Sequence, residues 1–112
     1  MVAFARRLGQ SVLTSNMNVE ISQSNRKDKR LKAKFQDKTV HFGAKGGQTF
    51  ADHGDQTKKE AWVARHEVRE NWQDMQTAGA LAKHVLWNKR TIAASIKDIN
   101  RRQKKYVFHM KE

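Results

Sequence analysis

Apolar and polar residues alternate along two segments in the first half of the chain. One covers residues 17–23, Met-Asn-Val-Glu-Ile-Ser-Gln, and the other covers residues 31–35, Leu-Lys-Ala-Lys-Phe. Alternation with a period of two is typical of a strand that buries one face. Residues 39–42 are rich in β-forming types and follow a connection of hairpin length at residues 36–38. The sequence therefore predicts two or three short strands in a small antiparallel ribbon, which ends at the glycines that begin with Gly43.

The pattern becomes helical in the second half of the chain. Thr57 and Glu60 have the spacing of a capping box, in which each side chain satisfies a free backbone N–H of the first turn. This spacing predicts a helix over residues 58–70. A second helix is predicted over residues 78–87, ending at Asn88.

A third helix is predicted after Thr91, which suits an N-cap position. Ile92, Ile96 and Ile99 fall within about 60° of one another on a helical projection, so they form an apolar stripe. Basic residues gather on the opposite side: Lys97, Arg101, Lys104 and Lys105. The apolar tail at residues 106–110 is compatible with a last strand or with a simple hydrophobic extension.

These elements indicate an α+β domain, with a small antiparallel β ribbon followed by about three short helices. We expect residues 1–28 to form an extended basic arm that includes Arg6 and Arg7 and orders only in an assembly. Residues 29–105 form the single domain, and residues 106–112 form a C-terminal tail.

Composition narrows the classes of protein further. The 112 residues allow one domain, and the absence of Cys excludes disulfides, thiolate metal ligands and thiol catalysis. The longest uncharged run, at residues 8–19, is 12 residues long, which is too short to span a bilayer. Because Arg6 and Arg7 lie inside the first apolar stretch, the order of a secretory signal is wrong. We therefore expect a protein that is neither secreted nor membrane-spanning.

The net charge of the chain says more about its partners than its length does. The chain has 23 Lys and Arg against 11 Asp and Glu, a formal charge of +12. Residues 1–45 carry 10 basic and 3 acidic groups, residues 46–76 carry 4 and 6, and residues 77–112 carry 9 and 2. Such an excess repels itself unless a partner neutralises it, which favours a polyanionic or acidic partner. The expected contacts are Arg6, Arg7, Arg26, Lys27, Lys29, Arg30, Lys97, Arg101, Lys104 and Lys105.

Metal and catalytic sites have little support. Asp52, His53 and Asp55 are adjacent, and His66 precedes Glu70 by four residues on the predicted helix. Without Cys or a paired-His motif these residues are more typical of turn and cap formers than of metal ligands. No triad order, carboxylate pair or phosphate loop is recognisable, so we expect no catalytic residue, no metal and no cofactor, and no small-molecule substrate.

The tryptophans allow two interpretations. Trp62, Arg65, His66 and Arg69 share a helix face, which could form a platform for nucleobases and phosphates. We favour the alternative that Arg65 or Arg69 stacks on an indole and pairs with Asp52, Asp55 or Asp74, because this segment is net acidic. We interpret Trp87 as a core residue.

Several short motifs, in this order and spacing, resemble a small uncharacterised domain family encoded by nucleocytoplasmic large DNA viruses of algae and amoebae. The resemblance covers about residues 29–102. The motifs are Lys29-Arg-Leu-Lys-Ala-Lys-Phe, Val40-His-Phe-Gly43, Thr49-Phe-Ala-Asp-His53 with Asp55, Arg65-His66, Glu70-Asn-Trp72, Thr77-Ala-Gly-Ala-Leu81, Leu86-Trp-Asn88 and Ser95-Ile96. The signature or structural residues carried by them are His41, Phe42, Gly43, Asp52, His53, Asp55, Trp62, Arg65, His66, Trp72, Gly79 and Trp87.

The resemblance implies a context and no active site. Such viruses use many small minor capsid proteins to hold capsomers together over an internal membrane and genome. We therefore expect a virion location and a structural role as a minor capsid protein that bridges capsid subunits on the inner side of the shell. The partners would be capsid or other virion proteins, and an anionic membrane surface is compatible with the same charges. The alternative is a basic nucleic-acid-binding or genome-packaging protein, and an enzyme that uses the His and Asp cluster is a remote third.

Overall fold

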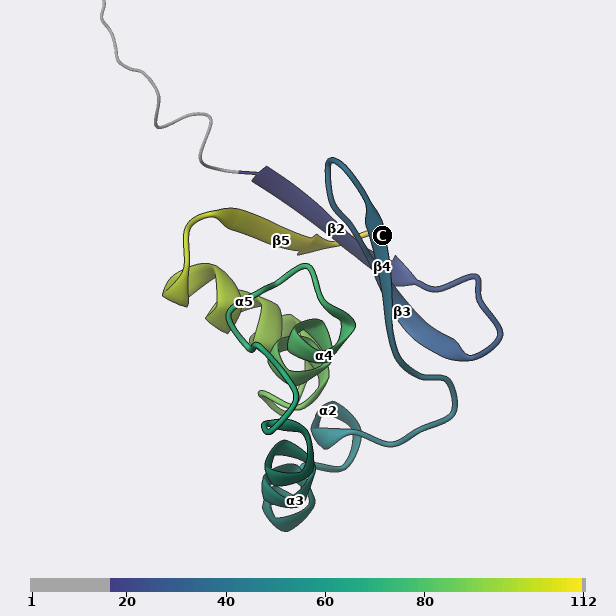
Figure 1. Ribbon diagram of the computed structural model, residues 1–112, viewed down its shortest axis with the longest axis vertical. Coiled ribbons are helices and arrows are strands. Elements are labelled where there is room, and N and C mark those ends of the chain that lie inside the picture. Colours follow the sequence, from purple (N-terminus) through teal and green to yellow (C-terminus); the bar gives the residue numbers. More distant parts are fainter. Residues whose placement is uncertain (1–16, 112) are drawn as a thin grey trace, which may run out of the picture.

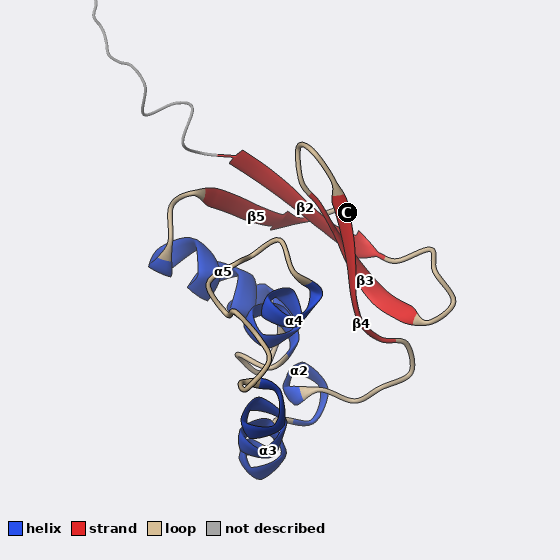
Figure 2. Cartoon of the chain, in the orientation of Figure 1, coloured by secondary structure: helices blue, strands red, loops and turns tan. Residues whose placement is uncertain are grey.

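The computed structural model describes residues 17–111, so the predicted contacts Arg6 and Arg7 lie outside the described residues. The chain forms an α+β domain in which helices lie on one side of a four-stranded sheet (Figures 1 and 2). The strands are β2 (Met17–Gln23), β3 (Lys29–Lys34), β4 (Thr39–Ala44) and β5 (Tyr106–Met110). Their order across the sheet is β4-β3-β2-β5.

The helical elements follow β4 and precede β5. They are α2 (Phe50–His53), α3 (Gln56–His66), α4 (Ala78–Leu81), the π-helical turn η2 (Ala82–Leu86) and α5 (Ile92–Arg102). In Figure 1, α4 and α5 lie beneath the sheet, and α3 extends away from it at the far end of the molecule. The helical layer that contacts the sheet is therefore built mainly from the second half of the chain.

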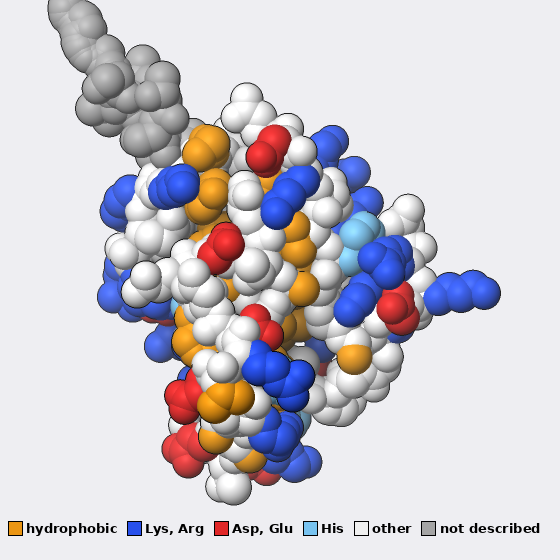
Figure 3. All heavy atoms as spheres, viewed as in Figure 1, with side chains coloured by type: hydrophobic (Ala, Val, Ile, Leu, Met, Phe, Trp, Pro, Cys, Tyr) orange, Lys and Arg blue, Asp and Glu red, His pale blue; other side chains and the backbone are white. Residues whose placement is uncertain are grey.

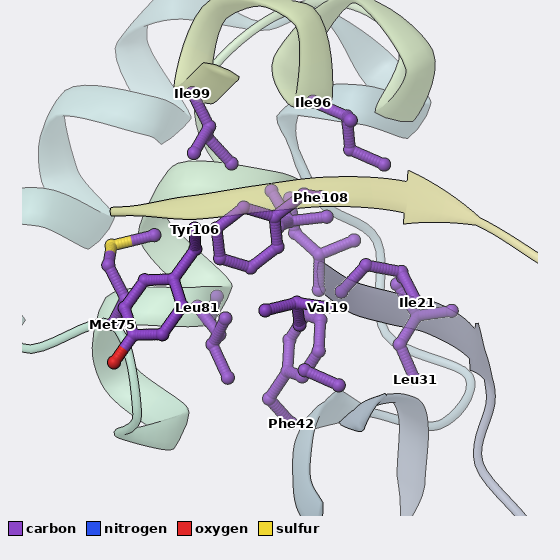
Figure 4. Close-up of a cluster of buried hydrophobic side chains, with 14 of the residues drawn as sticks. Val19, Ile21, Leu31, Phe42, Met75, Leu81, Ile96, Ile99, Tyr106 and Phe108 are labelled. Atoms are coloured by element: carbon purple, nitrogen blue, oxygen red, sulfur yellow. The ribbon is translucent and has the colours of Figure 1, made fainter. Parts of the chain in front are cut away.

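The core lies between the sheet and the helices. The alternation seen in the sequence places Val19 and Ile21 of β2 on the inner face of the sheet, and both side chains are fully buried. Phe42 and Phe108 are buried beside them. Ile99 of α5, at the top of the view in Figure 4, packs into the same cluster. Burying apolar surface of this kind is the main favourable contribution to folding.

The sheet is larger than the predicted ribbon, and it is mixed. β2 pairs with β3 and β3 with β4 in antiparallel register, as predicted for the ribbon. β5 pairs with β2 in parallel, with Met17 opposite Tyr106 and Ile21 opposite Met110. Two strands of this sheet therefore come from the segments that the domain division assigned to the arm and to the tail. A period of two shows that a segment buries one face, and it does not show which distant strand becomes its neighbour.

The capping box that we predicted for α3 is wrong. The N-cap is Asp55, whose carboxylate oxygen Oδ1 accepts the backbone N–H groups of Thr57 at 3.0 Å and Lys58 at 3.2 Å. Glu60 instead accepts a bond from the Gln56 amide on the helix surface. Because the Asp55 carboxylate bonds to the free N–H groups of the first turn, α3 starts at Gln56. The helix ends at His66, short of the predicted residue 70.

The two later helices also differ in detail from the predictions. The second one changes from α4 to η2, because the Trp87 N–H bonds to the Ala82 carbonyl five residues earlier. The third helix has the predicted Thr91 cap, with the Ala94 N–H donating to the Thr91 hydroxyl. It ends at Arg102, because Gln103 is extended. Lys104 and Lys105 therefore follow the helix and are not part of its basic face.

Side chains of α5 complete the outer edge of β5. The Asn100 amide donates to the Phe108 carbonyl and accepts the Phe108 N–H, each at 2.9 Å. The Gln103 amide makes the same pair of bonds to Tyr106, at 2.9 and 3.0 Å. An edge strand normally presents such backbone groups to solvent or to another chain. Here two amide side chains take the place of a fifth strand and tie β5 to α5.

We expect Asn100→Ala to destabilise the domain by about 2 kcal/mol, because two partly buried backbone groups of Phe108 lose their partner. Urea unfolding of the variant would show a lower midpoint than that of the unchanged protein. Asn25→Ala, in the exposed turn between β2 and β3, is the matched control and should leave the midpoint in place. Equal midpoints for both variants would show that the Asn100 amide does not hold β5.

Candidate functional site

Those predicted contact residues that the structure describes lie mainly in two separate places. Arg26 and Lys27 are exposed in the turn between β2 and β3, and Lys29 begins β3; these three residues form the hairpin surface. Arg26 lies 3.6 Å from the carboxylate of Asp28, and both side chains are more than half exposed. A surface pair of this kind contributes little and leaves the guanidinium accessible to a partner.

Arg30 is a correction to the predicted contact set. Its guanidinium makes two bonds to the Asp52 carboxylate, at 2.7 and 2.9 Å. The Thr49 backbone N–H also donates to Asp52 at 2.7 Å. Hydrogen bonds from Arg30 and Thr49 hold the pKa of the Asp52 carboxyl well below its usual range. Arg30 therefore ties β3 to α2 and is not a free cation.

The second basic region lies where α5 meets β5. Lys97 and Arg101 are exposed on α5, and Lys104 and Lys105 are exposed in the turn after it; these four residues form the helix-end surface. The Lys104 ammonium donates to the Asn100 carbonyl at 3.0 Å, which holds its stem along the helix end. All four are residues predicted as partner contacts, and two of them, Lys104 and Lys105, lie in the turn and not on the helix.

Asp98 balances part of this charge from the buried side of α5. Its side chain is 8% exposed and pairs with both Arg101 and Arg102. Hydrogen bonds from the Asn88 amide and the Arg102 guanidinium lower the pKa of Asp98 to about 2. Arg102, which the sequence analysis did not single out, is thereby fixed in one orientation.

The three tryptophans form a stack with His66. The Trp62 ring lies between its neighbours, with centroid distances of 4.2 Å to His66, 5.1 Å to Trp87 and 6.0 Å to Trp72. All four rings are partly buried, so Trp87 packs against the core and is not enclosed by it. The stack joins α3 to η2, and this matters because no residue of α3 is fully buried.

The predicted pairing of Arg65 or Arg69 with an aspartate is wrong. Asp52 pairs with Arg30, Asp55 caps α3, and the carboxylate of Asp74 accepts the Gln76 backbone N–H. Arg65 and Arg69 are exposed, and His66 takes the stacking position on Trp62. A flat ring displaces a flexible guanidinium there because the helix brings residues four apart onto one face.

Several atoms of the candidate metal ligands have structural partners, although His53 Nε2 is buried without one. His53 Nδ1 accepts the Asp55 N–H at 2.8 Å, and its ring meets Trp87 edge to face. His66 Nδ1 donates to the Trp62 carbonyl at 2.8 Å. Within residues 17–111, no group of three His, Asp or Glu side chains has an arrangement that could hold a metal ion.

The remaining signature residues support the fold. His41 bonds through Nδ1 to the Ser24 hydroxyl at 2.7 Å, which joins β4 to the end of β2. Gly43 has a positive φ of 78°, and a Cβ there would lie 2.7 Å from Leu86. At Gly79 a Cβ would overlap the Glu70 carboxylate. Both glycines therefore allow close approach of a neighbouring element.

A cleft of about 590 Å³ lies beside the helix-end surface, and the sequence analysis missed it. It is formed by the loop before α4, by η2, by the end of α5 and by the start of β5. No sequence motif marks it because its lining residues come from three separate stretches of the sequence. Its lining residues are Asn71, Trp72, Gln73, Asp74, Met75, His84, Ile99, Arg102, Gln103, Lys105 and Tyr106.

His84 connects two walls of this cleft. A carbonyl only accepts, so His84 Nε2 carries the proton and donates to the Trp72 carbonyl at 2.9 Å. Its Nδ1 accepts from the Arg102 guanidinium at 3.2 Å. Burial lowers the pKa of His84, and the nearby cations Lys83 and Arg102 lower it further. A neutral His84 thus holds Arg102 against the loop that carries Trp72.

Comparisons with known proteins identify no activity. The model of a family described as a family of unknown function, DUF5754, matches residues 19–66. That segment runs from β2 to the end of α3 and contains the hairpin surface, but it stops before the cleft. It is less than half of the chain. No curated protein matches the chain, and no solved structure does. In the part of the chain that the structure describes, none of the helices has the length and apolar character needed to cross a membrane.

We expect Trp62→Ala to release α3 locally, because this helix has no fully buried residue and depends on the stack. If the variant lowers the free energy of local opening of α3 by about 1.4 kcal/mol, the opening equilibrium changes tenfold. Amide exchange in α3 should therefore accelerate by about tenfold or more. Exchange measured by NMR should change much less in β2 and β3. Val68→Ala, a change at a side chain that is 81% exposed, is the control. Unchanged protection in α3 would contradict the role of the stack.

Stability should fall as the solution is acidified below about pH 6.5, because His84 takes up a proton more readily when unfolded. Its pKa is lowered in the folded state, so the stabilising contribution is complete above the unfolded pKa and is lost as pH decreases. Urea unfolding between pH 8 and pH 5 should show a smaller decline in His84→Gln than in the unchanged protein. His109→Gln, at an exposed position of β5, should keep the full decline. Equal declines in all three proteins would assign the pH dependence to other groups.

Proposed function

We propose that this chain is a binding protein with no catalytic role, and that it bridges two acidic surfaces. The observation that carries the proposal is the placement of its exposed cations. The turn between β2 and β3 and the turn between α5 and β5 lie at opposite sides of the view in Figure 1, and Lys and Arg side chains are present on both sides of the same view in Figure 3. They belong to a chain with a formal charge of +12, so both surfaces attract acidic partners over several ångströms of solution.

Some cations of the protein are bound in internal ion pairs, and this distinguishes them from the cations of the two surfaces. Arg30 is engaged by Asp52, and Arg102 is engaged by Asp98 and His84. The Arg30–Asp52 pair ties β3 to α2, and the Arg102–His84 bond ties α5 to η2, whereas the Arg102–Asp98 pair lies within α5. Lys27, Lys97, Lys104 and Lys105 of the two surfaces are exposed and belong to none of these pairs.

The most specific form of the proposal is a structural component of a large DNA virus particle. In that setting the chain is a minor capsid protein on the inner side of the shell, and each basic surface contacts an acidic face of a neighbouring capsid subunit. The resemblance of residues 29–102 to a domain family of such viruses supports this form. The sheet supports it too, because β2 pairs with both β3 and β5, the strands next to the two surfaces, and this pairing holds the surfaces at a constant spacing.

A second candidate function is nucleic-acid binding or genome packaging. The observation that favours it is the row of lysines on the outer face of the sheet. Lys32 and Lys34 of β3 are opposite Ser22 and Glu20 of β2 in register, on the face that the helices leave uncovered. Together with the hairpin surface they could track a phosphate backbone.

Fractionation of purified particles separates the two functions. We expect the chain to remain with capsid fragments after nuclease and detergent treatment, and mass spectrometry of each fraction measures this. Absence from particles, or release together with the genome, would reject the capsid function.

Salt dependence of DNA binding supplies the second arm of the test. A packaging protein loses affinity with a slope of about −0.9 per neutralised phosphate in a plot of log affinity against log salt. For a capsid-bridging protein we expect no measurable binding to duplex DNA at about 0.1 M salt.

The triple variant with Gln at positions 26, 27 and 29 should lose attachment to capsid fragments. A control with Gln at Lys38, Lys58 and Lys111, which are also exposed, should retain it.

A further inference from the structure

The cleft beside the helix-end surface combines apolar walls with a cationic rim. Trp72, Met75, Ile99 and Tyr106 supply the apolar part, and Figure 4 shows the Tyr106 hydroxyl beside Met75. Its volume of about 590 Å³ lies in the range of pockets that accept ligands, and it exceeds that of a single side chain. The cleft can therefore hold one large apolar side chain together with part of the backbone that carries it.

The cations at the rim are held in place before any partner arrives. Arg102 is bonded to Asp98 at 2.8 Å and to His84 at 3.2 Å, and its side chain is still 45% exposed. Lys105 lies over the Tyr106 ring, with its ammonium 5.4 Å from the ring centre. The lining also includes the carboxylate of Asp74, which accepts the Gln76 N–H, and the two cations Arg102 and Lys105 outnumber it. The site thus offers fixed positive charge next to an apolar cavity.

We propose that this cleft captures an apolar side chain from an acidic segment of a partner protein, while the helix-end surface binds the carboxylates on either side of that side chain. The proposal rests on the bridging function above, because it names the chemistry of one of the two acidic partners. Charge complementarity selects the acidic segment, and the apolar walls select the residue within it. The helix-end surface then contributes specificity as well as attraction.

The aromatic rings of the cleft argue against a nucleobase as the occupant. The Lys83 ammonium lies 5.5 Å above the Trp72 ring, and Trp62 stacks against that ring at 6.0 Å. Tyr106 meets Phe35 edge to face and carries Lys105 over its ring. A base would have to displace these cations in order to stack, although they are the charges that would attract it. An aliphatic or phenyl side chain needs only the apolar walls.

Two synthetic peptides of equal charge test the apolar contact. The first is Glu-Glu-Phe-Glu-Glu and the second is Glu-Glu-Ser-Glu-Glu, each titrated into the full-length, isotope-labelled protein and followed by NMR. We expect the phenylalanine peptide to bind at least about tenfold more tightly, since a buried phenyl ring contributes at least the free energy of a tenfold change. Its shift changes should cluster at residues 71–75 and 99–106.

Variants with matched controls test the charges at the rim. Gln73→Glu places a carboxylate at the mouth of the cleft, and it should weaken the phenylalanine peptide by about tenfold. Gln36→Glu makes the same change in the exposed turn before β4 and should have little effect. Lys105→Gln should weaken binding by about threefold or more, whereas Lys38→Gln should not.

Three outcomes would overturn the inference, and they separate it from the bridging function. If the two peptides bind with equal affinity, and the two Gln→Glu variants also bind with equal affinity, the helix-end surface attracts acidic segments but the cleft holds no side chain. The bridging function would then remain valid without the cleft. Shift changes at the cleft on adding a single-stranded oligonucleotide, stronger than those from the phenylalanine peptide, would make a nucleic acid the occupant. Failure of both peptides to bind anywhere on the protein would count against the acidic partners themselves, and bridging would fall as well.

Discussion

The parallel pairing of β2 with β5 is the constraint on which the rest of the structure depends. It joins residues 17–21 to residues 106–110, so the described chain closes on itself through its two outermost elements. A parallel neighbour requires a crossover, and the helices supply it on one face of the sheet. Phe108 is then buried beside Val19, and the core is complete only when β5 is in place.

The same pairing positions the helix-end surface and the cleft. Because β5 must return to the sheet directly after α5, the chain turns sharply at Gln103, and Lys104 and Lys105 are exposed at that turn. The amides of Asn100 and Gln103 hold the turn by bonding to β5 from the helix. The cleft forms in the space between this turn and the loop around Trp72.

A polar network extends this arrangement to the loop. Asn88 bonds to Asp98, Asp98 to Arg102, Arg102 to His84, and His84 to the Trp72 carbonyl. Every member has a partner, which is the condition under which a buried polar network specifies one conformation. The network connects the cationic rim of the cleft to the tryptophan stack, and the stack in turn holds α3. Charge, cleft and helix position are therefore linked through one set of contacts.

Local patterns in the sequence determined the elements, and the tertiary structure decided how they meet. The alternation at Val19 and Ile21, the Thr91 cap and the apolar stripe of α5 depend on residues within a few positions of one another, so the three antiparallel strands, that one cap and the basic segments were predictable. The cap at Asp55 was missed because Thr57 offered a competing local pattern. The partner of Arg30, the neighbour of β5, the stacking on Trp62 and the cleft were not predictable, because each joins residues whose distance in the sequence says nothing of their distance in space. Charge and periodicity are properties of the sequence, whereas the cleft exists only after burial of the core has brought three separate stretches of the chain together.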